Sequence, residues 1–317
     1  MATTTPPQQT PGKRRLIGIA AILTASITWG SIPLITRTVD GSPIITVFWR
    51  VTFGFLATSV YLLIKGKYSH LRGLDRKTII NLLAQGAVLG INWLLFIASF
   101  SYVNVAVGEL LAYVGPALVA VLAPLTLKEE RFNRRIILPL LLCLTGLVIV
   151  LDPRQLISTA IGGGSRQLLG CGFALSSAFT YAILMIRGKR FITNLDRDLI
   201  VWFEMFGGAL IMLPLAIFSY THGGAPSPTA QNYGLLLVLG TVHTASSSLL
   251  FYVGLQHLRA DETAIFTYAE AVSAAFFAAA FLHEPLTLPT ILGGALVVIG
   301  GTLVARSDNA LPTSDIV

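Results

Sequence analysis

Residues 108–130 read GELLAYVGPALVAVLAPLTLKEE, and their pattern recurs 155 positions later, in a stretch that overlaps IFTYAEAVSAAFFAAAFLHEPLT at 265–287. At this offset Tyr113 falls on Tyr268. The two stretches share an order of small, apolar and aromatic residues rather than identical residues. Weak internal similarity of this kind indicates a duplicated unit.

The duplication extends towards the N-terminus of each copy. LIGIAAILTASITW at 16–29 falls on LLGCGFALSSAFTY at 168–181, and TVFWR at 46–50 falls on IVWFE at 200–204. One half of the chain is therefore a diverged copy of the other half.

The composition is that of an integral membrane protein. Hydrophobic residues make up 54% of the 317 residues and charged residues only 12%, and the mean hydropathy is +0.74. A membrane-crossing helix needs about 20 apolar residues, and ten such runs are present, which predicts an all-α membrane protein with ten transmembrane helices. We place them near 16–36, 43–64, 78–99, 105–126, 136–151, 167–186, 198–220, 233–255, 262–282 and 288–305.

The net charge of +7 is a signal of topology rather than of nucleic-acid binding. If the N-terminus is cytoplasmic, the cytoplasmic segments hold 18 of the 22 basic residues and the external loops hold three, with Arg50 inside a span. This bias satisfies the positive-inside rule. We therefore expect a multi-pass plasma membrane protein with both termini in the cytoplasm.

Five spans per copy force the second copy to enter the membrane in the opposite orientation. The expected organisation is a disordered cytoplasmic tail (1–15), a first five-helix repeat (16–151), an external linker (152–166), an inverted second repeat (167–306) and a cytoplasmic tail (307–317). Many secondary transporters are built from inverted repeats that hold a substrate near the midplane, where the repeats meet.

Local motifs resemble those of a known family. They are an aromatic pair before Arg50, Pro116 thirteen residues before Glu129, and the segments HEPLT at 283–287 and GGALVVIGG at 293–301. On these residues the chain resembles the drug/metabolite transporter superfamily, and specifically its EamA-type branch with two tandem five-helix repeats. The resemblance covers roughly residues 16–306 and implies alternating access, but not a substrate.

Two positions depart from the family pattern. Ala271, preceded by Glu270, stands where the family usually has proline, and Glu204 occupies the position equivalent to Arg50. Neither departure removes the implied transport mechanism.

Four ionisable residues lie within predicted spans, where a charge costs about 2.5–3.5 kcal/mol at the bilayer centre on the insertion scale. Glu270 is predicted to bind substrate or a proton, or else to be a neutral carboxyl bonded to a neighbouring helix. Glu109 lies nearer the outer face, as a gating residue or a substrate contact. Arg50 and Glu204 are interpreted as structural charges, either paired with each other or bonded to helix ends.

Uncharged and titratable polar residues complete the predicted site. Two symmetry-related aromatic pairs, Trp29 with Tyr181 and Tyr113 with Tyr268, combine apolar area with a polar atom and suit either a substrate cavity or interhelix packing. Asn92 has the same two interpretations.

The eighth span adds two further candidates. His243 is either a proton relay or a neutral packing residue. Ser247 lies at the depth of Glu270 and is predicted to contact substrate.

The fifth and tenth spans carry few polar residues, so we expect them to be packing elements or a homodimer surface rather than cavity walls. In the tenth span, Gly293, Gly294, Gly300 and Gly301 share one face. The lipid bilayer and a small-molecule substrate are the other expected partners.

No cofactor, metal site or enzymatic activity is expected. Cys143 and Cys171 lie in apolar runs, and HExxH, GxSxG and phosphate-loop motifs are absent from the sequence. We expect a secondary transporter that exports amino acids or related small metabolites. The alternatives are an uptake carrier for a cofactor or nucleoside, an intramembrane lipid-modifying enzyme and a passive channel.

Overall fold

The computed structural model describes residues 11–36, 38–39, 42–151, 164–222, 228–283 and 285–307. Most of the two predicted tails and of the linker lies outside these residues. Within them the regular secondary structure is entirely helical.

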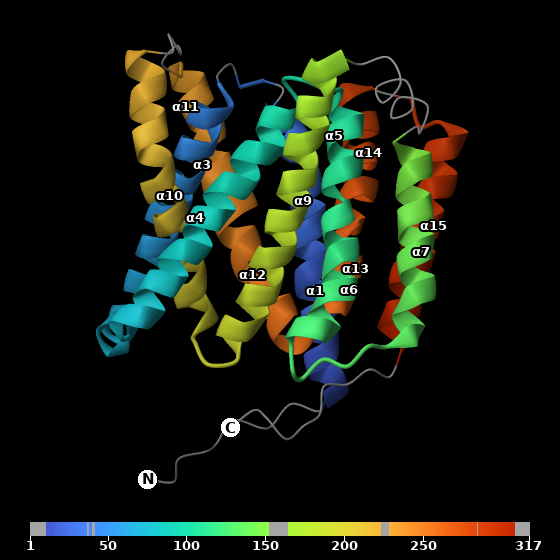
Figure 1. Cartoon of the computed structure of the whole chain (residues 1–317), viewed down its shortest axis with the longest axis horizontal. Helices are drawn as coiled ribbons and strands as arrows, with labels where there is room; N and C mark the ends of the chain where they lie inside the picture. Colours follow the sequence, from blue (N-terminus) through green and yellow to red (C-terminus); the bar gives the residue numbers. More distant parts are fainter. Residues whose placement is uncertain are drawn as a thin grey trace.

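The helices follow the predicted spans closely (Figure 1). In the first repeat they are α1 (Pro11–Gly30), α2 (Ile32–Thr36), α3 (Pro43–Ile64), α4 (Arg76–Ser99), α5 (Val105–Ala112), α6 (Val114–Thr126) and α7 (Ile137–Val150). In the second repeat they are α9 (Gly164–Ile192), α10 (Arg197–Thr221), α11 (Ala230–Gly240), a π-helical turn (Thr241–Ser246), α12 (Ser247–His257), α13 (Ala260–Thr267), α14 (Ala269–Leu282) and α15 (Leu288–Arg306).

Nine of these helices or consecutive helix sets are long and apolar enough to cross a membrane. The tenth crossing is α7, which has only 14 residues, or roughly 21 Å of helix, and runs alongside α15. The prediction of ten transmembrane helices is confirmed on this basis.

The two repeats run in opposite directions (Figure 1). The first runs upward along α1 and downward along α3, while the second runs downward along α9 and upward along α10. The lower end carries the basic segments 13–15, 65–77, 128–135 and 187–197 together with Arg259 and Arg306, and we call it the basic end. The predicted inversion of the repeats is confirmed.

The fourth helix of each repeat is broken at the same relative position. Pro116 cannot donate to the carbonyl of Ala112, and the helix divides at Tyr113 between α5 and α6. The second copy has no proline there. Its break is made by tight turns instead, in which Tyr268 N donates to Ile265 O (3.2 Å) and Ala271 N to Tyr268 O (3.1 Å).

Glycines allow the closest helix crossings. A Cβ atom on Gly86 of α4 would lie 2.6 Å from the carbonyl oxygen of Glu204 on α10, so the absence of a side chain at this position allows the two helices to approach closely. A Cβ on Gly293 of α15 would lie 2.4 Å from Gly146 O on α7.

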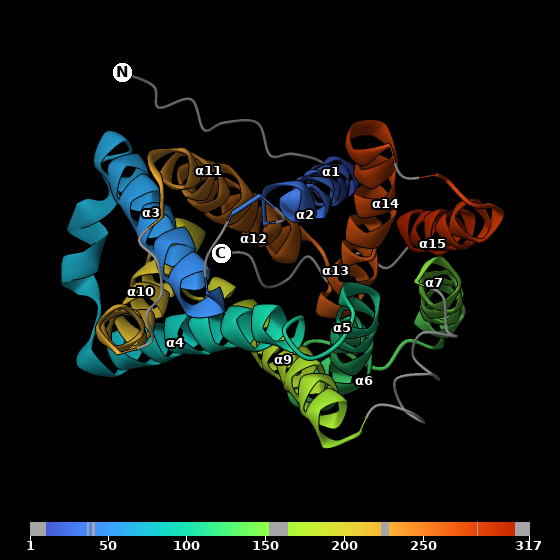
Figure 2. The same ribbon diagram turned by 90° about the horizontal axis from the view of Figure 1, so that it is seen from above.

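The α7–α15 pair stands at one edge of the molecule (Figure 2), with part of its outer surface apolar and exposed. Because Gly293 packs within the chain, only that outer surface is available for a homodimer, which stays a prediction.

Candidate substrate cavity

A cavity of about 250 Å³ lies between the two repeats. Its lining reaches Thr36, Phe100 and Val105, at the helix ends opposite the basic end. Towards the basic end the lining stops at Met185 and Tyr252. The cavity therefore extends from the centre of the bundle towards one end only.

All four ionisable residues singled out within the spans line this cavity: Arg50, Glu109, Glu204 and Glu270. Arg50 is 5% exposed, and its Nε donates to Thr244 Oγ1 at 2.8 Å. Its guanidinium carbon lies 3.9 Å from the centre of the Trp93 ring, a cation–π contact. The Arg50 cation is thus held in a fixed orientation at the cavity wall.

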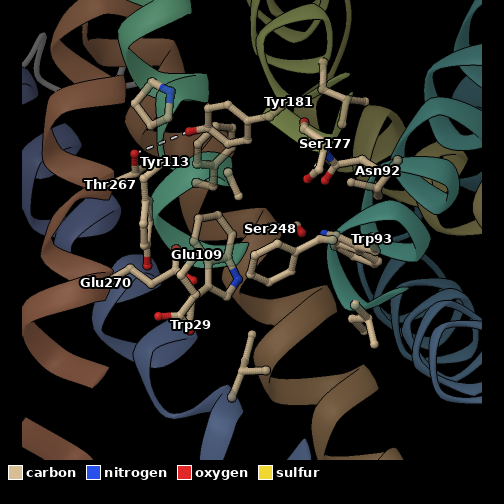
Figure 3. A pocket seen from close by; sticks show the side chains of 18 of the residues that line it. Trp29, Asn92, Trp93, Glu109, Tyr113, Ser177, Tyr181, Ser248, Thr267 and Glu270 are labelled. Atoms are coloured by element: carbon tan, nitrogen blue, oxygen red, sulfur yellow. Dashed lines mark hydrogen bonds between the residues drawn. The ribbon is translucent and has the colours of Figure 1, made fainter. Parts of the chain in front are cut away.

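Acidic groups lie on the other side of the cavity. Glu270, at the start of α14, interacts electrostatically with Arg50 and with Glu109. Figure 3 shows Glu270 and Glu109 on one side of the opening and Trp93, on which Arg50 stacks, on the other. The cavity therefore presents a cation and carboxyl groups across a shared space.

Aromatic side chains form much of the remaining wall (Figure 3). Trp29 donates from Nε1 to the carbonyl of His243 at 2.9 Å and lies against Phe251, with ring centres 5.6 Å apart. Tyr181 OH lies 3.4 Å from Thr267 Oγ1, and Tyr113 also lines the cavity. The predicted positions of Trp29, Tyr113 and Tyr181 at a cavity are therefore matched by the geometry.

Asn92 also lines the cavity, but its amide nitrogen is engaged by α9. Nδ2 donates to Ser177 O at 2.7 Å and to Thr180 Oγ1 at 2.9 Å. Asn92 can therefore offer a ligand its carbonyl oxygen, as an acceptor, more readily than its N–H groups.

Ser247 was predicted to contact substrate, but it does not line this cavity. Its side chain is 1% exposed, and its hydroxyl donates to Val242 O at 3.0 Å, while Ser248 lines the cavity. The π-helical turn Thr241–Ser246 widens one turn, which rotates the next helix relative to a regular α-helix. Hydrophobic periodicity alone does not reveal such a turn.

Of the two interpretations given for Tyr268, a substrate cavity or interhelix packing, the geometry matches interhelix packing. Tyr268 is fully buried within an apolar cluster that includes Leu147 and Val297, and its hydroxyl donates to Tyr113 O at 3.1 Å. The two repeats break at equivalent tyrosines, but only the first tyrosine faces the cavity. The second links the two broken helices.

His243 lies behind the cavity wall. Its Nε2 is 2.9 Å from Ser31 Oγ, and its Nδ1 is 3.4 Å from Val238 O. The contact with Ser31 and the hydrogen bond from Trp29 Nε1 to the His243 carbonyl connect the π-helical turn to the end of α1. A proton-relay role for His243 stays a prediction.

Sequence reasoning treated Arg50 and Glu204 as structural charges and did not place them at the cavity. Trp93, Ser177 and Ser248 were also missed as lining residues. The only available signal was that Arg50 and Glu204 are opposite charges at equivalent positions of the duplication.

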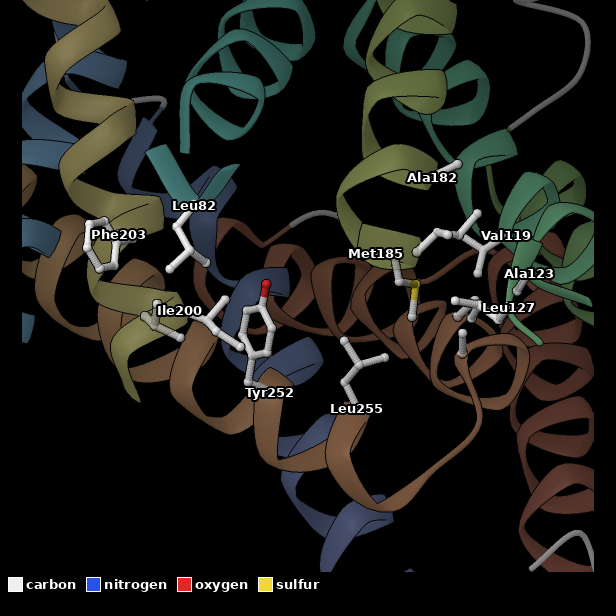
Figure 4. Close-up of a cluster of buried hydrophobic side chains, with 14 of the residues drawn as sticks. Leu82, Val119, Ala123, Leu127, Ala182, Met185, Ile200, Phe203, Tyr252 and Leu255 are labelled. Atoms are coloured by element: carbon white, nitrogen blue, oxygen red, sulfur yellow. The ribbon is translucent and has the colours of Figure 1, made fainter. Parts of the chain in front are cut away.

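The basic end is closed by an apolar plug. Side chains from both repeats meet there with almost no exposure (Figure 4), among them Leu82, Val119, Leu127, Met185, Ile200 and Leu255. These residues lie between the cavity and the basic loops, so the plug seals the cavity from the basic end.

Charged contacts reinforce this closure. Arg15 Nη1 lies 2.9 Å from Glu262 Oε1, and Arg259 Nη2 lies 2.8 Å from Asp261 Oδ2. Arg259 also donates to Arg131 O at 2.7 Å, which connects α13 with the loop after α6.

Glu130 and Lys189 add two further connections at this end. Glu130 Oε1 accepts from Ala260 N at 2.7 Å, and burial raises the pKa of the Glu130 carboxyl. Lys189 Nζ donates to Leu255 O at 2.7 Å and to Leu258 O at 2.5 Å. The bonds of Lys189 connect the end of α9 with the end of α12. The pair of Arg15 and Glu262 connects the starts of α1 and α13.

Two inverted five-helix repeats that enclose a polar, aromatic cavity define a multi-helix membrane transporter. The chain belongs to the EamA-like transporter family, whose profile matches residues 16–152 and 168–306. The expected family membership is confirmed.

Similar proteins carry transporter names without a stated substrate. An uncharacterized transporter of Archaeoglobus fulgidus is 26% identical over 91% of this chain and 96% of its own length. The uncharacterized transporter YxxF of Bacillus subtilis is 24% identical over 97% of each chain. The uncharacterized inner membrane transporter YicL of Salmonella typhimurium is 24% identical over 91% of this chain and 95% of its own length.

A solved crystal structure has the same fold. It superposes with a TM-score of 0.77 at 18% sequence identity, over 94% of this chain and 99% of that chain.

Proposed function

We propose that the protein is a secondary transporter that exports zwitterionic amino acids, or closely related metabolites, by alternating access. The observation that carries the proposal is the placement of a cation, Arg50, and a carboxyl group, Glu270, in the lining of one aromatic cavity. The family membership supports transport, and the charges of the cavity support the substrate class.

A zwitterion satisfies both sides of this cavity at once. A guanidinium binds a carboxylate through charge-assisted hydrogen bonds, which suits Arg50 to the carboxylate of an amino acid. Glu270 and Glu109 would receive the ammonium group. Trp29, Tyr113 and Tyr181 would pack an apolar or aromatic side chain.

The closed basic end supports alternating access. Inverted repeats can exchange conformations, so that the cavity opens at one end and then at the other. If the positive-inside rule sets the orientation, the basic end is cytoplasmic and the structure represents a state closed to the cytoplasm. An inner membrane relative supports location in the cytoplasmic membrane.

The direct test is transport of radiolabelled L-phenylalanine into proteoliposomes that contain unlabelled L-phenylalanine. Wild-type protein should give saturable counterflow. Glu270→Gln removes the charge that would hold the ammonium group, so binding should weaken about tenfold or more. Glu129→Gln removes the same charge from an exposed loop and should leave transport unchanged.

Unchanged counterflow in Glu270→Gln would remove Glu270 from the site. Absence of saturable wild-type counterflow across the standard amino acids would reject the proposed substrate class.

A further inference from the structure

Glu204 occupies the floor of the cavity and takes part in a network separate from the Arg50–Glu270 pair. It lies on α10, is 5% exposed and lines the cavity. Tyr252 OH, from α12, donates to Glu204 Oε1 at 2.5 Å. Gln85 Nε2, from α4, donates to the same oxygen at 3.1 Å. Two donors from different helices thus meet on one carboxyl oxygen, and neither bonds to Oε2.

The orientation of the Gln85 amide is fixed by its other bonds. Arg187 Nε donates to Gln85 Oε1 at 3.0 Å, and Gln85 Nε2 also donates to Leu184 O at 2.9 Å. Arg187 is in turn held by a bond from Nη2 to Asn81 O at 3.0 Å. Gln85 must therefore present its NH₂ group to Glu204, and a chain of polar groups leads from the cavity floor towards the basic end.

The donors that reach Glu204 are uncharged. In the described part of the chain it forms no ion pair with lysine, arginine or histidine. The titratable and charged groups on the neighbouring helices are Tyr252 on α12, Arg187 on α9 and Arg50 on α3. Arg187 bonds to Gln85, and Arg50 is engaged by Thr244 and Trp93. A carboxyl group with neutral donors, next to a cavity, can exist in both its charged and its neutral form.

Glu204 and Arg50 occupy equivalent positions in the two repeats but differ in chemistry. A guanidinium stays charged at all physiological pH values, whereas a carboxyl can gain or lose a proton. The duplication has thus produced one permanent cation and one titratable acid at the edge of the same cavity.

We propose that Glu204 is the binding site of the proton that drives transport, and that this site is distinct from the substrate site. The proposal rests on the transport function proposed above. When the cavity is open opposite the basic end, a hydronium ion in the cavity transfers a proton to Glu204 Oε2, which leaves a water molecule and a neutral carboxylic acid. When the basic end opens, the proton leaves Oε2 for water on that side.

Protonation also affects the closure of the basic end. The charged carboxylate accepts strong hydrogen bonds from Tyr252 and Gln85, and so connects α10 with α12 and α4. Neutralisation weakens both bonds, because a charge-assisted hydrogen bond is stronger than a neutral one. Proton binding at the floor therefore favours separation of the helices that close the basic end.

The test compares wild-type protein with Glu204→Gln, which keeps the side-chain volume and the carbonyl acceptor but cannot titrate. Two processes are measured with radiolabelled L-phenylalanine: accumulation driven by an imposed pH gradient, and counterflow without a gradient. One coupled proton and a gradient of about one pH unit support about tenfold accumulation. Glu204→Gln should lose this accumulation, and its remaining counterflow should no longer depend on pH. Glu204→Asp should recover part of the accumulation.

Accumulation at the wild-type level in Glu204→Gln would overturn the proposal, and so would wild-type transport that does not respond to the pH gradient.

If L-phenylalanine is not carried at all, infrared spectroscopy of the purified protein tests the proton site. A protonated-carboxyl band that appears on acidification in wild-type protein and is missing from Glu204→Gln supports the proton site. Identical spectra for the two proteins reject it. The infrared result does not depend on the substrate, so failure of the proton site and failure of the proposed function can be told apart.

Discussion

The two ends of the bundle are built from equivalent parts of the two repeats but are held by different chemistry. At the basic end, α13 begins with Arg259, Asp261 and Glu262, all of which form charged contacts. At the offset of 155 the equivalent residues at the start of α5 are Asn104, Ala106 and Val107. The opposite end, which the cavity reaches, therefore lacks these charges at the equivalent positions.

This difference indicates that the free energy needed to open the basic end differs from the free energy needed to open the opposite end. Opening the basic end separates the charged contacts that join different elements, Arg15 with Glu262 and Arg259 with Arg131 O, and an unpaired buried charge is costly. Opening the opposite end separates largely uncharged surfaces at the equivalent positions. In the absence of substrate, the structure should therefore favour a closed basic end, and weakening the ion pairs there should shift the balance towards opening.

The largest effect is expected for Arg259→Ala. It leaves Asp261, which is fully buried, without its guanidinium partner. Because that pair lies within the start of one helix, the change that affects closure is the loss of the bond from Arg259 Nη2 to Arg131 O, between α13 and the loop after α6. A hydrogen bond from a charged group contributes about 1.5–3 kcal/mol, so the population open at the basic end should rise roughly 10- to 100-fold. The readout is the rate at which a thiol reagent labels Ala123→Cys in the apolar plug, in a background without Cys143 and Cys171.

The matched control is Arg306→Ala, which removes an exposed charge from the same end. A labelling rate in Arg259→Ala no higher than in this control would show that Arg259 does not hold the basic end closed.

An intermediate effect is expected for Arg15→Ala. Arg15 bonds to Glu262 and to Val304 O, but its side chain retains 17% exposure, so solvent can replace part of the lost interaction. We expect a shift of about 1–2 kcal/mol, or roughly 5- to 30-fold in the labelling rate. Lys13→Ala, which removes an exposed charge from the same helix, should change the rate little. A larger effect in Lys13→Ala than in Arg15→Ala would reverse this assignment.

The smallest effect is expected for the partly exposed pair of Lys67 and Asp196, 2.7 Å apart. Burial disfavours the charged form of the Asp196 carboxyl. The hydrogen bond from Lys67 and the positive charge of Lys67 act in the opposite direction, and the pKa of Asp196 lies below its ordinary value. The stabilisation is therefore present above about pH 4 and is lost as the pH falls through the lowered pKa. Asp196→Asn should lower the melting temperature slightly at pH 7, consistent with about 0–1 kcal/mol.

The difference in melting temperature between wild-type protein and Asp196→Asn should shrink as the pH falls below about 4. A difference that grows on acidification would contradict the assigned charge state.

Much of the fold could be predicted because its signals are carried by composition and by duplication. The ten spans follow from apolar runs, and the inversion follows from an odd number of spans with a one-sided distribution of basic residues. The breaks at Tyr113 and Tyr268 were not predicted. The proline in the first copy is visible in the sequence, but the second copy is broken without one.

The site was predicted less completely, because hydrophobic periodicity does not determine which side chains of a helix face the cavity. Local irregularities such as a π-helical turn change this direction. Trp29, Tyr113, Tyr181 and Glu270, which depth and residue type had singled out, line the cavity, and their contacts with substrate stay predictions. Ser247 was misplaced because a π-helical turn changes the register of the eighth span. Tyr113, which lines the cavity, and Tyr268, which is buried in an apolar cluster, show that equivalent positions of a duplication can face different surroundings.

The most direct test of alternating access is a pair of distance measurements by electron–electron double resonance. Spin labels at Lys13 and Arg131 report on the basic end, and labels at Thr38 and Val105 report on the opposite end, all at exposed positions. On addition of L-phenylalanine and an imposed acidic pH, the distance at the basic end should lengthen while the distance at the opposite end shortens. Two distances that stay constant, or that lengthen together, would contradict the reciprocal opening of the two ends.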